Sequence, residues 1–494
     1  MKLIRFFLPR LEYVVLLALF WSAASNGPKL LNLDGDLPRH LLLGQLIRET
    51  RSVPTTDTFS FRTEGFPAIP HEWLSQVALS TADDLMGLSG VVLLTAILIT
   101  AVWAIVYQEA TRRSNSLFIN LFILTLGIAI SIIHVLPRPH LFTYLFTALW
   151  ILVLERITDG RPKLWWLLPA LMLLWVNMHG MFVLGIIIWS IYLVGSWLEN
   201  PSRIWLTNPS SKSLLLGGFL SLLVTFLSPS GIHIWESIIS LGSNAYITSR
   251  IPEYQSANFH MPETWPFIIL LGLTLIGFAR TANKTNWSHI LLVSAFAAIA
   301  LYTSRMLPLF AIVAVPITAK SLSELVQQEF PESRFAAVEK NFSTMNSTSN
   351  GWVWLLVIVI AVTLIFSLGQ TIDPGSVGNV FHESFFPVDA VEWLNENPQN
   401  GHMFNEFDWG GYLLLKLSPQ QQIFMDGHTH IYGEALTREY ETVITQRDGW
   451  QDIFEKYQIR WAIVRTKSPV IDGLTEMSWS VIYQDDTSTI LHKR

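Results

Sequence analysis

The chain has 494 residues, of which 51% are apolar and 14% charged, with 20 Trp, no Cys and a formal net charge of −6. Soluble domains carry about 25% charged residues, so the composition indicates a membrane protein, and the mild negative charge argues against a nucleic-acid partner. The absence of cysteine excludes disulfides, thiolate catalysis and cysteine-ligated metals.

Runs of about 17–25 apolar residues are long enough to cross a bilayer. About eleven such runs lie near 11–26, 84–108, 117–136, 140–155, 163–178, 181–198, 213–229, 265–280, 287–303, 305–320 and 352–369. The first run follows the basic stretch MKLIRFFLPR and ends near SAAS, so it also resembles a signal peptide. We expect it to be retained, because the charge pattern of the loops starts from it.

Lysine and arginine are concentrated in the loops on the side of the N-terminus. That side holds Lys2, Arg5, Arg10, Arg112, Arg113, Arg156, Arg161, Lys163, Arg203, Lys212, Arg280, Lys284, Lys320, Arg334 and Lys340. The short loops of the other side hold Arg138, Arg250 and Arg305, and the long first loop adds Lys29, Arg39, Arg48, Arg51 and Arg62.

Because Lys and Arg favour the cytoplasmic side, this pattern predicts a multi-pass protein of the cell (inner or plasma) membrane with its N-terminus in the cytoplasm. An odd number of crossings puts the C-terminus outside. The inner segment 321–351 is rich in Ser and Asn, and we expect it to be partly disordered.

Beyond about residue 371 the apolar runs shorten and charges return. Helix-like stretches (VDAVEWLNEN, GEALTREYETVITQ, DIFEKY) alternate there with strand-like stretches (QQIFMD, RWAIVR, WSVIYQ, STILHK). This alternation is typical of a small α/β domain. The sequence therefore predicts a transmembrane domain over 1–370 and an extracytoplasmic α/β domain over 371–494.

Polar side chains that can carry chemistry gather in the outer segments. Charged residues near membrane depth are functional candidates by default, and Asp34-Gly35-Asp36 in the first outer loop, which joins the first two apolar runs, is the foremost case. The other candidates on this face are His40, His71, Glu72, Arg138, His140, His179, Arg250, Glu253 and Arg305. Because all these candidates lie on the outer side of the membrane, the sequence predicts an active site on the external face.

Several stretches carry a resemblance to a known family. They are DGDLPRHLLLGQLIRETRSVPTTDTFSF, HEWLSQ, RPHLFTYLF, WVNMHG, FNEFDWGGYL and FMDGHTHIYG. Over most of its length the chain resembles the GT-C superfamily of membrane glycosyltransferases, in a bacterial uncharacterised branch similar to polyprenyl-phosphate-sugar-dependent mannosyltransferases and oligosaccharyltransferases.

The resemblance implies a helical GT-C-like membrane fold and a polyprenyl-linked sugar donor. It also implies that an acidic residue of the first outer loop, here Asp34 or Asp36, is catalytic or binds a metal. DWGGY at 408–412 is faintly similar to the WWDYG signature of oligosaccharyltransferases but departs from it at most positions. Recognition of an acceptor peptide is therefore not carried over.

The chemistry of sugar transfer fits the same residues. A carboxylate, Asp36 or Asp34, takes the proton of the attacking hydroxyl in an inverting reaction, and Asp36 shares a face with His40 if 37–47 is helical. Asp34, Asp36 and Glu72 suit Mg²⁺ or Mn²⁺. The departing lipid phosphate needs positive charge, for which the candidates are Arg138, His140, His179, Arg250 and Arg305, with Glu253 beside them.

Each candidate also has a purely structural interpretation. Asp36 precedes Leu37-Pro38 as a helix N-cap does, Asp34 is simply solvated, and His71-Glu72 starts a surface helix. Arg138-Pro139-His140, His179-Gly180 and Asp426-Gly427-His428 are turns, and Arg305 is a boundary anchor.

Two other functions stay open. A polytopic transporter or lipid flippase needs charges near the bilayer midplane, whereas the acidic residues here cluster at one rim. A non-catalytic membrane scaffold is the third hypothesis. The sequence does not identify the acceptor, which is a glycan, a lipid or a protein.

Overall fold

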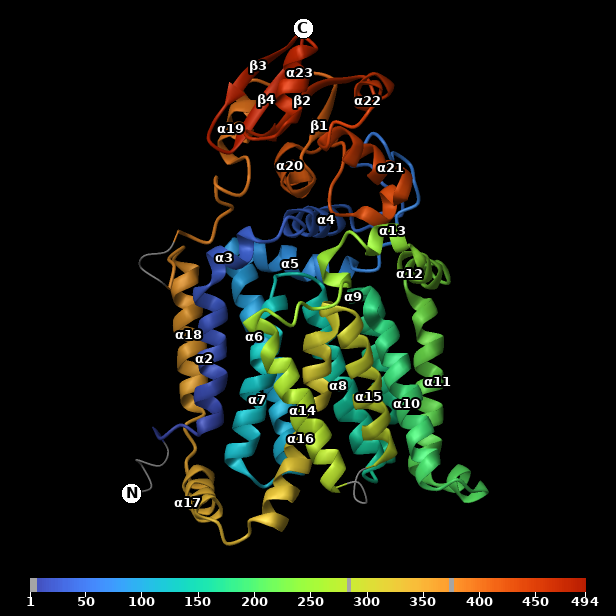
Figure 1. The fold of residues 1–494 in the computed structure, drawn as a ribbon, viewed down its shortest axis with the longest axis vertical. Coiled ribbons are helices and arrows are strands. Elements are labelled where there is room, and N and C mark those ends of the chain that lie inside the picture. The colour runs from blue at the N-terminus through green and yellow to red at the C-terminus, as the bar shows by residue number, and fades with distance from the viewer. Residues whose placement is uncertain (1–6, 282–285, 373–376) are drawn as a thin grey trace.

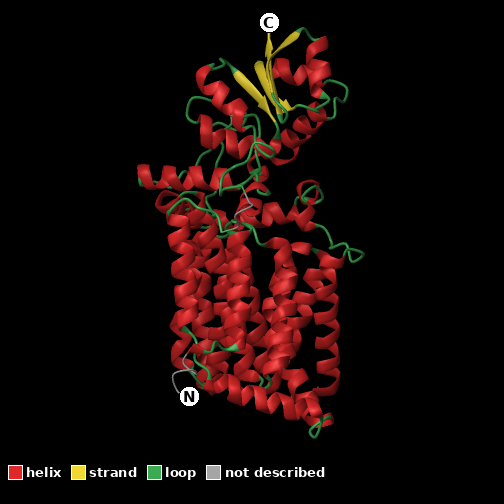
Figure 2. Ribbon diagram, turned by 90° about the vertical axis from the view of Figure 1, so that its left-hand side faces the viewer, coloured by secondary structure: helices red, strands yellow, loops and turns green. Residues whose placement is uncertain are grey.

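The computed structural model describes residues 7–281, 286–372 and 377–494. A bundle of long helices forms one part, and a small sheet with its helices lies over one end of it (Figure 1). Figure 2 shows that the strands are confined to this C-terminal part. Lys2, Arg5 and Lys284, which contributed to the predicted charge bias, lie outside the described residues.

Seven helices among the described residues are long and apolar enough to span a membrane. They are α6 (Leu88–Arg113), α7 with η1 (Leu117–His134), α8 (His140–Thr158), η3 with α10 (Gly180–Glu199), α11 with η5 (Pro209–Leu227), η7 with α14 (Pro262–Thr281) and η9 with α16 (Ser304–Glu329). The result confirms a polytopic helical membrane protein.

Four further predicted runs fall on shorter helices. These are α2 (Leu11–Ser25), α9 (Leu167–Met178), α15 (Trp287–Tyr302) and α18 (Val353–Ser367). Helix α18 follows α17 (Arg334–Thr348) across a bend of 66°. Because of these short helices, the count of eleven crossings stays a prediction.

The predicted disorder of 321–351 is wrong. Helix α16 continues to Glu329, and α17 covers most of the remainder. Glu339 of α17 accepts hydrogen bonds from the free backbone N–H groups at the start of α7, and Phe118 packs on Phe335 and Phe342. A carboxylate at a helix N-terminus is favourable, so this segment is fixed to the bundle.

Buried ion pairs join α6, α8 and α15 at the end of the bundle opposite the sheet. Glu155 contacts Arg113 at 2.5 Å and His289 at 3.0 Å, and it accepts a hydrogen bond from Tyr192. Glu109 pairs with Arg113 at 2.8 Å. The charges of α6 and α8 lie near the C-terminal ends of these helices, and His289 lies in the first turn of α15. The ion pairs therefore link helix ends and do not lie at the middle of the bundle.

The first outer loop contains three helices, α3 (Gly27–Asn32), α4 (Leu37–Thr50) and α5 (Trp73–Met86). Helix α4 begins at Leu37-Pro38, as predicted, because proline suits the first turn of a helix. It lies across the end of the bundle, beneath the C-terminal part (Figure 1). Its Gly44 contacts the backbone of Gln76 in α5, where a side chain would overlap.

The C-terminal sheet has the order β1-β2-β4-β3, with β1 and β2 parallel and the other pairs antiparallel. Strands β2 (Ile459–Arg465), β3 (Trp479–Gln484) and β4 (Ser488–Lys493) confirm three predicted strands, whereas β1 (His402–Asn405) was not foreseen and QQIFMD is not a strand. The helices are α19 (Val388–Glu396), α20 (Gly410–Leu417), α21 (Thr429–Ile444), α22 (Trp450–Lys456) and α23 (Val470–Glu476).

The first outer loop also enters the core of the C-terminal part. Phe59 is buried with residues of α19, α20 and β2, and its carbonyl accepts a hydrogen bond from Ile423 N–H. Arg62 pairs with Glu439 at 2.7 Å and lies over the ring of Phe424. The predicted division at residue 370 stays a prediction, and this loop packs on both sides of it.

Candidate active site

A cavity of about 990 Å³ lies between the end of the bundle and the C-terminal part. Helix α4, the starts of α5, α8 and η9, the loop around α13 (Ala245–Thr248) and the segment 425–430 contribute its walls. It collects ten of the eleven residues predicted from sequence, namely Asp36, His40, His71, Glu72, Arg138, His140, His179, Arg250, Glu253 and Arg305. The remaining one, Asp34, lies behind the wall.

The two aspartates of the first outer loop have different environments. Asp34 is 0% exposed and contacts Arg138 Nη2 at 2.6 Å, so the interpretation that it is solvated is wrong. The Asp36 side chain is 32% exposed, and its Oδ2 lies 3.1 Å from Arg138 Nη1. Asp36 makes no side-chain capping hydrogen bond to α4. The carboxylate that faces the cavity is therefore that of Asp36.

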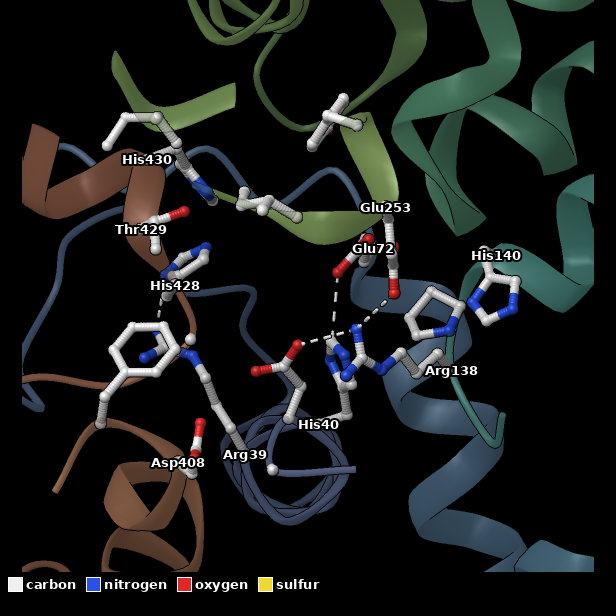
Figure 3. Close-up of a pocket in the computed structure, with 18 of the residues that line it drawn as sticks. Arg39, His40, Glu72, Arg138, His140, Glu253, Asp408, His428, Thr429 and His430 are labelled. Carbon is white, nitrogen blue, oxygen red and sulfur yellow. Dashed lines mark hydrogen bonds and ion pairs between the residues drawn. The ribbon is translucent and has the colours of Figure 1, made fainter. Parts of the chain in front are cut away.

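Arg138 lies at the centre of an acidic group. Besides the two aspartates it contacts Glu253 Oε1 at 3.6 Å (Figure 3). Burial lowers the pKa of Arg138, but the ion pairs with Asp34 and Asp36 more than offset this effect and raise it above its usual value. Arg138 is therefore a permanent cation in front of Asp36.

Glu72 lies among three histidines. Its carboxylate oxygens are 3.5 Å from His179 Nε2, 3.7 Å from His71 Nε2 and 3.9 Å from His40 Nδ1. Glu72 also directly precedes α5, so the predicted helix start is confirmed, and the same residue lines the cavity. An acidic side chain and three imidazole rings thus gather at this wall of the cavity.

Arg305 is the cavity arginine that makes no ion pair with a carboxylate within the described residues, although the charges of Glu253 and Glu72 are near enough to act on it. Its guanidinium contacts Tyr254 OH at 3.2 Å and His179 Nε2 at 3.4 Å. His179 in turn bonds Thr143 Oγ1 at 2.8 Å. His140 lines the same wall and bonds the carbonyl of His134 at 2.8 Å. A half-buried guanidinium that makes no direct ion pair is a suitable place for a phosphate.

Arg250, also predicted for the phosphate, is already paired. It contacts Glu441 of α21 and lies 3.5 Å above the ring of Tyr246, whose hydroxyl bonds Glu441 at 2.8 Å. Arg438 also contacts that ring, at 3.9 Å from its centre. Arg250 thus joins the α13 loop to the C-terminal part, whereas the sequence suggested it as a ligand of the lipid phosphate.

Three glycines allow the C-terminal part to approach the first outer loop. An added Cβ at Gly35 would lie 2.7 Å from the carbonyl of Asp408, and one at Gly411 would lie 2.7 Å from the carbonyl of Gly35. A Cβ at Gly427 would overlap Asp36 Oδ1. Glycine is required where two backbones approach this closely. The stretches DGD, DWGGY and MDGH therefore meet in one place.

Sequence reasoning missed four site residues, three of which the C-terminal part brings in. Arg39 of α4 pairs with buried Asp426 and contacts His428 Nδ1 at 2.6 Å. His428, Thr429 and His430 face Arg138, Glu253 and Glu72 across the cavity (Figure 3). Burial lowers the pKa of His428 and of His430 well below the usual range, so both are neutral at pH 7. Only the turn at Asp426-Gly427-His428 was visible in the sequence.

The residues predicted to bind Mg²⁺ or Mn²⁺ do not fit a metal as they are arranged. No group of three His, Asp or Glu side chains within the described ranges is placed to hold one. Asp34 and Asp36 both contact the guanidinium of Arg138, which repels a second cation, and Glu72 contacts histidines. This arrangement leaves a divalent ion no place among the carboxylates that were predicted to bind it.

Comparisons with known proteins identify the fold. No family model matches the sequence, and no curated protein matches it. The archaeal oligosaccharyltransferase AglB from Archaeoglobus fulgidus, in complex with an inhibitory peptide and a dolichol-phosphate, matches at a TM-score of 0.55 and 12% identity, over 91% of this chain and 69% of that one. Its apo form matches at a TM-score of 0.57, also at 12% identity and with the same coverage. ArnT from Cupriavidus metallidurans, bound to undecaprenyl phosphate, gives a TM-score of 0.45 at 12% identity over 97% of both chains. The chain has the GT-C fold, as its sequence resemblance implied.

Proposed function

We propose that this chain is a membrane glycosyltransferase, which transfers a sugar from a polyprenyl (pyro)phosphate donor to an acceptor hydroxyl on the extracytoplasmic face. One observation carries the proposal. A cavity-facing carboxylate, Asp36, and a half-buried arginine without an ion pair among the described residues, Arg305, line the same 990 Å³ space at one end of a membrane bundle. A structural neighbour with the same fold was solved with a dolichol-phosphate.

Asp36 is proposed as the general base. Arg138 holds Oδ2, while Oδ1 occupies the space that a Cβ on Gly427 would fill, so the glycine allows the carboxylate to lie at the cavity wall. An acceptor hydroxyl hydrogen-bonded to this carboxylate is oriented towards the anomeric carbon, and its proton moves to Asp36 as the new bond forms.

Arg305 is proposed to bind the phosphate of the donor. Attack by the acceptor oxygen forms the new C–O bond as the bond from the anomeric carbon to the phosphate oxygen breaks, and the electron pair stays on that phosphate. A fixed guanidinium stabilises the negative charge that develops there. Because the acceptor enters opposite the leaving group, one displacement inverts the anomeric configuration.

The cavity position supports an external site. It lies at the end of the bundle opposite the ion pairs of Arg112, Arg113 and Arg156, on the side where arginine and lysine are rare in the short loops. Lys and Arg favour the cytoplasmic side. The same end carries the C-terminal part, which we place outside the cell membrane.

The experiment is sugar release by the purified protein in liposomes. Radiolabelled polyprenyl-phosphate and polyprenyl-pyrophosphate sugars serve as donors, and water or a cell-envelope extract serves as acceptor. We expect consumption of at least one lipid-linked donor and none of a nucleotide sugar. Binding of the lipid donors without any consumption would support the scaffold hypothesis, and their movement across the bilayer without cleavage would support a flippase.

A further inference from the structure

Three carboxylates from two outer segments surround Arg138. Asp34 and Asp36 belong to the first outer loop at 2.6 and 3.1 Å, and Glu253 belongs to the loop before α14 at 3.6 Å. Arg138 itself lies between α7 and α8. Three carboxylates that converge from different loops are the oxygen ligands typical of a divalent cation. Here a side chain of the protein occupies their centre.

The guanidinium of Arg138 neither balances the charge of the three carboxylates nor satisfies all their oxygens. Three negative charges face one positive charge, and Asp34 Oδ2 is buried without a hydrogen-bond partner among the described residues. Arg138 Nε is also buried without one. A fully buried carboxylate oxygen normally has a partner. The group therefore keeps the charge and an open oxygen that a small divalent ion requires.

Arg138 is held there firmly enough to exclude such an ion. Asp34 is entirely buried, and its Oδ1 also accepts the backbone N–H of Asp36 at 2.9 Å, which fixes the acid in place. An arginine does not lose its proton in proteins. A metal ion at the same carboxylates would lie within a few ångströms of the Arg138 guanidinium, and the two positive charges would repel each other.

We propose that Arg138 is a built-in substitute for a divalent cation. Its guanidinium holds Asp34, Asp36 and Glu253 together and keeps Asp36 oriented, so that the native protein works without a metal. As they stand among the described residues, the three carboxylates are not placed to hold a metal, but removal of Arg138 would allow them to move together around a divalent cation. The orientation of Asp36 rests on the proposed function, but the prediction about metal binding does not.

Binding of Mn²⁺ to the full-length protein in detergent tests this directly. Free Mn²⁺ is followed by electron paramagnetic resonance after EDTA treatment of the wild type, Arg138→Ala and Arg138→Ala/Glu253→Gln. We expect no stoichiometric binding to the wild type and one site in Arg138→Ala, at least about tenfold tighter than any wild-type binding. The double variant should lose that gain.

A second measurement is needed because Arg138→Ala could fold poorly when its carboxylates repel one another. Thermal unfolding with and without Mn²⁺ should show a shift for Arg138→Ala and none for the wild type, because a ligand stabilises the state that binds it. Arg138→Lys keeps the charge and should show neither binding nor shift.

Two results would overturn the proposal. One is stoichiometric Mn²⁺ binding by the wild type that Asp36→Asn abolishes, and the other is a folded Arg138→Ala protein that gains no site. Donor consumption distinguishes the claims. A wild type that consumes donor at the same rate with and without EDTA supports both the metal proposal and the proposed transferase function. If the protein has no transferase activity but gains the Mn²⁺ site when Arg138 is removed, only the proposed function fails.

Discussion

Gly427 of the C-terminal part lies so close to Asp36 that a Cβ added to the glycine would overlap Oδ1 of the aspartate. The carboxylate proposed as the base is thus bordered by a residue from the other end of the chain. The contact explains why a glycine stands there, and it makes the position of Asp36 dependent on the C-terminal part.

Gly427→Ala is expected to lower the rate of sugar transfer by about 10²-fold, because a displacement of about 1 Å at a catalytic group has that effect. The unfolding temperature should change little. The comparison is Gly272→Ala in α14, where an added Cβ meets no atom within 4 Å. Equal kcat values for the two alanine variants would show that Gly427 does not border the working carboxylate.

Arg305→Ala is expected to weaken donor binding by about 10–100-fold, because a hydrogen bond to a charged group contributes about 1.5–3 kcal/mol. The effect should appear in KM for the lipid-linked donor. Arg280→Ala, on an exposed side chain at the other end of the bundle, is the matched control. A wild-type KM in Arg305→Ala would assign the phosphate to other residues.

The cavity histidines His428 and His430 make stability dependent on pH. Burial lowers the pKa of His428 and His430 well below about 6.5 in the folded state, while the unfolded chain keeps its ordinary value. As the pH falls below about 6.5 the unfolded state therefore binds protons that the folded state does not, and stability decreases. Above that pH the contribution is fully present.

We expect the unfolding temperature to fall between about pH 7.5 and pH 5, and to fall less in His430→Gln. His233→Gln provides the control, because that side chain is exposed on α12 (His233–Ser243). Differential scanning calorimetry in detergent gives the result. Identical pH profiles for the wild type and His430→Gln would mean that His430 is not buried as a neutral group.

Glu155→Gln should destabilise the bundle by about 3 kcal/mol, because it leaves a buried arginine short of one of its partners. Asp159→Asn removes an exposed contact to Arg112 and should cost less than about 1 kcal/mol. Chemical unfolding in detergent compares the two. Donor consumption below the unfolding temperature should be unchanged in both, because the cluster lies at the end remote from the cavity.

Much of the fold was predictable from local sequence. Apolar runs located the membrane helices, Leu37-Pro38 located the start of α4, and alternating residues located β2, β3 and β4. These features depend on neighbours in the chain. The prediction for residues 321–351 was wrong because polar composition alone does not reveal that Glu339 binds the start of α7.

The candidate site was only partly predictable. Counting the membrane crossings placed four candidates on the same side of the membrane, namely Asp36, Glu72, Arg138 and Arg305. All four line the cavity. The pairing of Arg39 with Asp426 joins residues 387 positions apart, and no periodicity or motif predicts such a contact. The same holds for Arg250, whose partner Glu441 lies in the C-terminal part.

Single-turnover transfer by Asp36→Asn is the most direct test of the proposed reaction. The rate with a lipid-linked donor is compared with that of Asp84→Asn, which alters an exposed aspartate of α5. General-base catalysis contributes about 10²–10⁴-fold, so we predict a loss of that size in Asp36→Asn and none in Asp84→Asn, with donor binding retained by both. Transfer by Asp36→Asn at the wild-type rate would contradict the account.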